Sequence, residues 1–110
     1  NEVKFNIGLN DNIYESEEIK TILNYSGFPV FETTLTEVRM GEYLGYDEPT
    51  FVTTVGTTLD ENAIHAEVEA LCRMFRQSCI AIKINGTGHL VYHPHYDAKK
   101  FKFDNNLFLD

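Results

Sequence analysis

The chain has 110 residues, of which 43% are hydrophobic and 13% aromatic, a composition typical of one globular domain and not of a disordered segment. Its 17 acidic and 9 basic residues give a net charge of -8, which argues against direct binding of nucleic acid or of an anionic membrane surface. No apolar run approaches the roughly 20 residues of a membrane-spanning helix, so we expect a soluble, cytoplasmic protein.

The two cysteines, Cys72 and Cys79, do not make a disulfide scaffold. Each is more easily interpreted as a small buried side chain in a reducing compartment. No signal peptide is visible, but the chain starts at Asn1, which leaves a removed leader open.

The first part of the chain predicts a strand, a short helix and a second strand. Residues 3–9 alternate apolar and polar side chains, as in a strand that is buried on one face. A helix follows, with Ser16 as its predicted N-cap and Gly27 at the left-handed position that ends it. Beyond Pro29, residues 30–40 are rich in β-branched and aromatic types and predict the second strand.

Residues 41–49 are expected to form a loop that recognises a cationic or protein partner. This loop is longer than most hairpin connections and contains aromatic and carboxylate side chains. The partner-binding candidates in it are Tyr43, Tyr46, Asp47 and Glu48. The alternative is an ordinary hairpin connection whose tyrosines cover the edge of the sheet.

A third strand over residues 50–55 leads to the most regular part of the chain. Residues 58–61 have the pattern of a capping box, with Thr58 as the N-cap of a second, amphipathic helix. The hydrophobic period changes to two at Cys79, which predicts a strand that turns back at residues 85–88 into a hairpin.

These elements follow the order β-α-β-β-α-β, with an extra C-terminal hairpin strand. We therefore expect an α+β fold, a ferredoxin-like sandwich in which two helices cover one face of an antiparallel sheet. The first and fourth strands should be neighbours. Residues 1–96 should form the domain, and residues 97–110 an extension that packs on the domain or on a second subunit.

Three histidines lie within seven positions near the end of the hairpin, and an aspartate follows them. His93 and His95 have the spacing that places two imidazoles on one face of a strand and suits a metal such as Zn²⁺. The candidate metal ligands are His89, His93, His95 and Asp97, with His65 as a more distant addition. The intervening proline argues against a regular strand, and the alternative is a set of exposed histidines without a metal.

Side chains that alternate with the core residues should form the helix-free face of the sheet. If the first and fourth strands are neighbours, this open face contains Lys4, Val52, Thr54, Ala81 and Lys83. The face is small and partly apolar, which makes it a candidate homodimer interface or a shallow anion site. The alternative is a solvated sheet face.

No catalytic constellation is identifiable. The acidic pairs of the second helix do not share a face, and the glycines at the hairpin lack the helix that a phosphate-binding loop requires. We therefore expect a homodimeric binding domain without enzymatic activity or cofactor. Two alternatives stay open: a metal- or small-ligand-dependent enzyme that uses the histidines, and an acidic inhibitor or nucleic-acid mimic directed at a basic partner.

Overall fold

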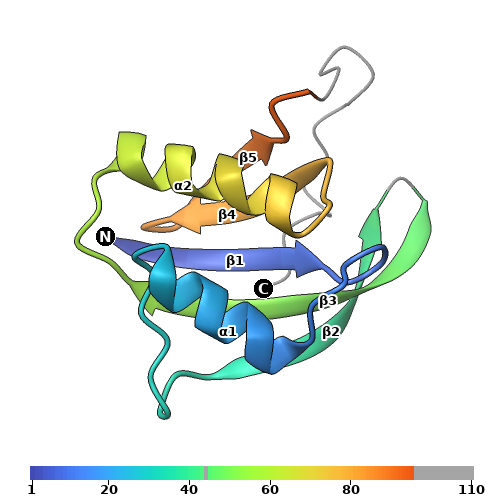
Figure 1. Cartoon of the computed structure of the whole chain (residues 1–110), viewed down its shortest axis with the longest axis horizontal. Coiled ribbons are helices and arrows are strands. Elements are labelled where there is room, and N and C mark those ends of the chain that lie inside the picture. Colours follow the sequence, from blue (N-terminus) through green and yellow to red (C-terminus); the bar gives the residue numbers. More distant parts are fainter. Residues whose placement is uncertain (44, 96–110) are drawn as a thin grey trace.

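The computed structural model describes residues 1–43 and 45–95, which form a helix layer packed on a sheet layer (Figure 1). Within these residues, five strands make one sheet, and both helices lie on the same face of it. The elements in chain order are β1 (Glu2–Gly8), α1 (Ser16–Tyr25), β2 (Thr36–Tyr43), β3 (Tyr46–Gly56), α2 (Glu61–Met74), β4 (Cys79–Ile84) and β5 (Thr87–Tyr92).

The strand order in the sheet is β2-β3-β1-β4-β5, and all neighbouring strands are antiparallel. β1 is the central strand and pairs with β4, as expected for the first and fourth strands. The predicted α+β class, with its β-α-β-β-α-β element order and an extra hairpin strand, is therefore confirmed. Neither helix of the described residues is long and apolar enough to cross a membrane.

The hydrophobic core lies between the sheet and the two helices. Val3, Phe5 and Ile7 alternate along β1 and are fully buried, so this side of the strand faces the helices. The ring of Phe28 meets Phe5 edge-on, with ring centroids 4.9 Å apart. The helices contribute the buried side chains of Ile19, Leu23, Ile64, Val68, Leu71 and Cys72. The remaining residues of β1 consequently face the helix-free side.

Both helices begin at caps that differ from the predicted ones. The N-cap of α2 is Asp60 and not Thr58, because the Asp60 carboxylate accepts a backbone N–H of the first turn at 2.8 Å. The N-cap of α1 is Glu15 and not Ser16, and the backbone N–H of Glu15 donates to a first-turn carboxylate at 3.2 Å. In both helices, an acidic residue near the predicted cap satisfies the helix terminus.

The predicted loop between the second and third strands is wrong, because most of its residues belong to the strands. β2 extends to Tyr43 and β3 begins at Tyr46, and these two residues pair directly. Gly45, with φ at 83°, lies in the short connection between them. β2 starts only at Thr36, later than predicted. Because the pairing continues to Tyr43 and Tyr46, the two strands form a long two-stranded arm (Figure 1).

The hairpin between β4 and β5 turns at Asn85 and Gly86, which have positive φ values of 49° and 87°. Ile84 pairs with Thr87 across this turn, as expected for a two-residue connection. The predicted extension of residues 97–110 lies outside the described residues.

Candidate functional site

A pocket of about 360 Å³ opens on the helix-free side of the sheet, where β1 ends and β4 begins. On the sheet it is lined by Asn6 and Gly8 of β1 and by Ala81 of β4, which pairs with Asn6. Because Phe5 and Ile7 point into the core, these alternate residues face away from the helices. The turn after β1, the α2–β4 connection, the β2–β3 arm and Leu90 of β5 form the remaining walls.

Gly8 leaves room for two acceptor groups at the end of β1. A Cβ atom at this position would lie 2.5 Å from Glu48 Oε1 and 2.6 Å from Gln77 Oε1. The Gln77 side chain is buried, and its Nε2 donates to the backbone oxygens of Phe75 at 3.0 Å and Asn10 at 3.4 Å. A carboxylate oxygen and a fixed amide oxygen therefore converge in the space that Gly8 leaves.

The Glu48 carboxyl is half-buried, and its burial raises its pKa above the ordinary value of 4.5. The negative charge of Asp11 acts in the same direction. The backbone N–H of Asn10 donates to Glu48 Oε2 at 3.3 Å, and this hydrogen bond lowers the pKa in part. Because the ionised carboxylate has lost some of its water, a cationic ligand would interact with it more strongly than with an exposed one.

The described residues that line the pocket give it a net negative charge. They include the acidic residues Asp11 and Glu48 and one basic residue, Arg76, whereas Glu42 pairs with Asp47 and therefore points its side chain to the other face of the arm. Tyr46 adds an aromatic ring to the wall. A concave site with an aromatic ring and two carboxylates suits a small cationic ligand, and its volume lies within the range of small-molecule sites.

The predicted partner-binding residues of the β2–β3 arm contribute to this pocket only in part. Tyr46 and Glu48 line it, whereas Asp47 pairs with Glu42 across the hairpin. Tyr43 pairs with Tyr46 through the backbone. Tyr46 and Glu48 therefore belong to a pocket wall and not to a separate loop.

The structure places the predicted open-face residues together on the helix-free side. Lys4 lies directly opposite Lys83 on β4 and opposite Thr54 on β3. Val52 and Ala81 flank the same residue of β1, from either side. The pocket opens on this face, and Ala81 is shared between the two.

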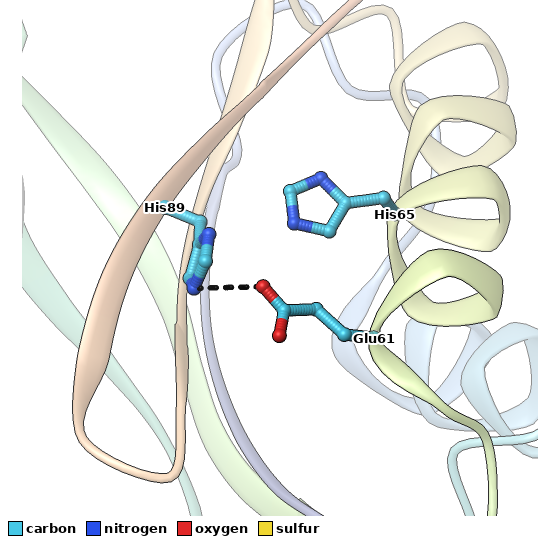
Figure 2. A group of neighbouring side chains, drawn as sticks. All are labelled: Glu61, His65 and His89. Atoms are coloured by element: carbon cyan, nitrogen blue, oxygen red, sulfur yellow. Dashed lines mark ion pairs between the residues drawn. The ribbon is translucent and has the colours of Figure 1, made fainter.

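A second group of side chains lies on the opposite side of the sheet, between β5 and α2. His89 pairs with the buried Ile82 and therefore faces the helices. Its ring lies edge-on to that of His65, with centroids 5.0 Å apart, and its Nε2 lies 3.8 Å from Glu61 Oε1 (Figure 2). Among the described residues, these three ligand-bearing side chains form the group that could hold a metal ion.

His93 and His95 have different surroundings from His89. They line a shallow hollow of about 400 Å³ together with Arg73 and Arg76. The Nδ1 of His93 accepts the backbone N–H of His95 at 3.1 Å. Guanidinium groups beside these imidazoles disfavour a bound cation. Asp97 lies outside the described residues, so the metal site predicted from these residues stays a prediction.

Glu61 was not among the metal ligands predicted from the sequence, although two signals could have grouped it with His65 and His89. Glu61 and His65 are four residues apart on the predicted second helix, which places them on one face. A two-residue turn at the β4–β5 hairpin sets Ile82 opposite His89, which assigns this histidine to the helix side. No such signal predicts the close approach of Gln77 to Gly8, because the two residues belong to segments far apart in the chain.

No protein-family model and no curated protein matches the chain. Among solved structures, it is similar to a phage SAM lyase in its apo state, with a TM-score of 0.56 and 16% sequence identity. The similarity covers 87% of this chain and 91% of the lyase chain. At this identity the likeness shows a shared fold.

Proposed function

We propose that this chain binds a small sulfonium metabolite, S-adenosylmethionine (SAM), in the acidic pocket. The observation that carries the proposal is the half-buried Glu48 carboxylate, which faces a pocket of net negative charge. SAM carries a sulfonium, an ammonium and a carboxylate, so its net charge is opposite to that of the pocket. The similar fold belongs to a protein whose name says that it is a lyase for SAM, which supports this choice among small cations.

The pocket offers partners for the charged groups and the base of such a ligand. Glu48 and Asp11 suit the two cationic groups, and the Gln77 amide oxygen supplies a neutral acceptor beside them. Arg76 suits the carboxylate, because a guanidinium pairs with it through two parallel hydrogen bonds. Tyr46 suits the adenine ring or the sulfonium, both of which interact favourably with an aromatic face.

Cleavage of a carbon–sulfur bond of SAM is a second candidate function, favoured by the raised pKa of Glu48. When this bond breaks, its electron pair goes to sulfur, which leaves as a neutral thioether. The amino-acid fragment then gains an electron pair from its own carboxylate, which closes a lactone, or from a C–H bond whose proton a base removes. Glu48 would hold the sulfonium in the first route and accept the proton in the second.

Isothermal titration calorimetry with SAM and with S-adenosylhomocysteine, the neutral thioether analogue, tests the binding proposal. We expect SAM to bind more tightly than the analogue, and Glu48→Gln to reduce the affinity for SAM at least about tenfold while leaving the analogue little changed. Glu32→Gln is the matched control, because it removes one exposed carboxylate outside the pocket. Mass spectrometry of the products after incubation with SAM tests cleavage and separates the lactone from the elimination product.

Two results would overturn the binding proposal. One is the absence of SAM binding at millimolar concentration by a folded protein. The other is equal binding of SAM and its neutral analogue, which would show that the carboxylates do not recognise the sulfonium charge.

We also propose a homodimer, the oligomeric state expected from the sequence, but with a different interface. Lys4 and Lys83 face each other at the centre of the open face, so burial of this face would remove two cations from water. The edge strand β2 offers a more suitable surface. Its residues Val38 and Met40 are 53% and 64% exposed, and they point to the same side of the strand. Native mass spectrometry should show a dimer that Val38→Glu with Met40→Glu dissociates; a monomeric wild-type chain would end this proposal.

A further inference from the structure

Glu61, His65 and His89 bring three potential metal-ligand atoms to one place, on the helix side of the sheet and apart from the acidic pocket. Their ligand atoms all lie within 4.8 Å of one another. Glu61 and His65 project from the first turns of α2, and His89 faces them from β5 (Figure 2). The site therefore joins a helix to an edge strand that are separate in the sequence.

The geometry is close to that of a tetrahedral metal site. Zinc binds imidazole nitrogen and carboxylate oxygen at about 2.0–2.2 Å, which sets neighbouring ligand atoms ~3.3–3.5 Å apart. His89 Nε2 and Glu61 Oε1 are already 3.8 Å apart. The other ligand atoms lie within 4.8 Å of one another, so each pair has ~1.5 Å or less to close before it reaches zinc-site spacing.

Burial and charge also suit a metal ion. The His89 side chain is 21% exposed and that of Glu61 is 63% exposed, so the imidazoles are partly shielded while the carboxylate borders the solvent. The cation would lie near the positive end of the α2 dipole, and the Asp60 and Glu61 carboxylates offset this repulsion. Three protein ligands leave one tetrahedral position for water, as in zinc sites that remain open to exchange.

We propose that Glu61, His65 and His89 bind a divalent transition metal, with Zn²⁺ as the ion that two imidazoles and one carboxylate suit best. The bound metal holds the start of α2 against β5, the edge strand that otherwise has one neighbour within the described sheet. This site is independent of SAM binding, and neither its success nor its failure decides the function of the acidic pocket.

The test is titration of the full chain with Zn²⁺ alone, after treatment with a chelator, followed by calorimetry and thermal unfolding. We expect one ion per chain, a higher melting temperature with Zn²⁺, and reversal by the chelator. His65→Gln and His89→Gln should each lower the zinc affinity at least tenfold. Co²⁺ in place of Zn²⁺ should give the visible absorption of a four-coordinate ion in the wild type and not in these variants.

Two further variants keep the test decisive. Glu61→Gln changes an exposed side chain, so it preserves the fold and should still weaken zinc binding. His93→Gln with His95→Gln removes the two histidines beside Arg73 and Arg76 and should leave zinc binding unchanged. The proposal is overturned if the chain shows no saturable zinc binding, or if the His93 and His95 substitutions, rather than those of His65 and His89, abolish it.

Discussion

The Glu48 carboxylate occupies the space beside Gly8 that the side chain of any other residue would need. A Cβ at position 8 would lie 2.5 Å from Glu48 Oε1 and 2.6 Å from Gln77 Oε1, which is too close for these atoms to coexist, so both acceptor groups must move. Gly8→Ala should therefore turn the carboxylate out of the pocket. A charge-assisted contact contributes about 1.5–3 kcal/mol, so we expect the affinity for SAM to fall at least about tenfold in calorimetry.

Gly56→Ala is the matched control for this substitution. Gly56 also ends a strand of the sheet, but a Cβ there would have no neighbour within 4 Å. The control should keep the wild-type affinity and the wild-type circular dichroism. If Gly8→Ala binds SAM as tightly as Gly56→Ala does, the two acceptor groups beside Gly8 have no role in recognition.

The raised pKa of Glu48 makes a prediction about stability and pH. An acid whose pKa is higher in the folded state binds its proton more tightly there, so its ionisation costs stability as the pH rises above its ordinary value of 4.5. Glu48→Gln removes this cost. The free energy of unfolding of the Glu48→Gln variant, relative to that of the wild type, should therefore increase from pH 4 towards neutral pH and then level off.

Chemical denaturation at a series of pH values measures this difference. Glu32→Gln, which changes an exposed carboxylate, should give a difference that stays nearly constant over the same range. A Glu48→Gln curve that falls relative to wild type with rising pH would show that the ionised Glu48 stabilises the fold, and hence that another group neutralises it.

Local sequence patterns predicted the elements of this fold because each has its own signal. The alternation of Val3, Phe5 and Ile7 defined the central strand, and Asn85 with Gly86 defined a turn that requires positive φ. Local patterns gave the wrong assignment where turn-forming residues stand among strand-forming ones. The glycines and the proline between residues 41 and 49 indicated a loop, although most of these residues pair in strands.

The candidate sites depend on contacts that span the chain, and local patterns carry little information on these. Gln77 reaches Gly8 from the α2–β4 connection, and a glycine in a strand says only that something lies close to it. The sequence predicted one metal site from His89, His93 and His95 because these residues are close together in the chain. Strand direction instead separates His89, on the helix side, from His93 and His95 beyond the end of β5.

The cap of α2 provides a direct test of one corrected prediction. Asp60 accepts the backbone N–H of Ala63 at 2.8 Å, whereas Thr58 is exposed and lies before the helix. Asp60→Ala should lower the free energy of unfolding by ~0.5–2 kcal/mol, and Thr58→Ala by much less. Urea denaturation of both variants measures the difference. A larger loss of unfolding free energy for Thr58→Ala than for Asp60→Ala would show that Thr58 is the N-cap.

The two cysteines should differ in reactivity. Burial raises the pKa of the Cys72 thiol to about 12, and the thiol donates to the backbone oxygen of Val91 at 3.3 Å. Iodoacetamide at pH 8 should therefore leave Cys72 unmodified in the native protein and alkylate the half-buried Cys79 first. Because Cys79 lines the acidic pocket, SAM should slow its alkylation, as followed by peptide mass spectrometry. Unchanged alkylation at saturating SAM would place the ligand elsewhere.

The stability of the sheet should depend strongly on Ile82. This residue lies on β4 between Phe5 of β1 and His89 of β5, and its side chain is fully buried against the helix layer. Ile82→Ala removes three carbons from a closely packed core and should lower the free energy of unfolding by ~2–5 kcal/mol. Leu35→Ala, at a position 78% exposed just before β2, should change it by less than about 0.5 kcal/mol. A loss below about 1 kcal/mol for Ile82→Ala would mean that the core relaxes into the space, and that β4 is less tightly packed than its burial indicates.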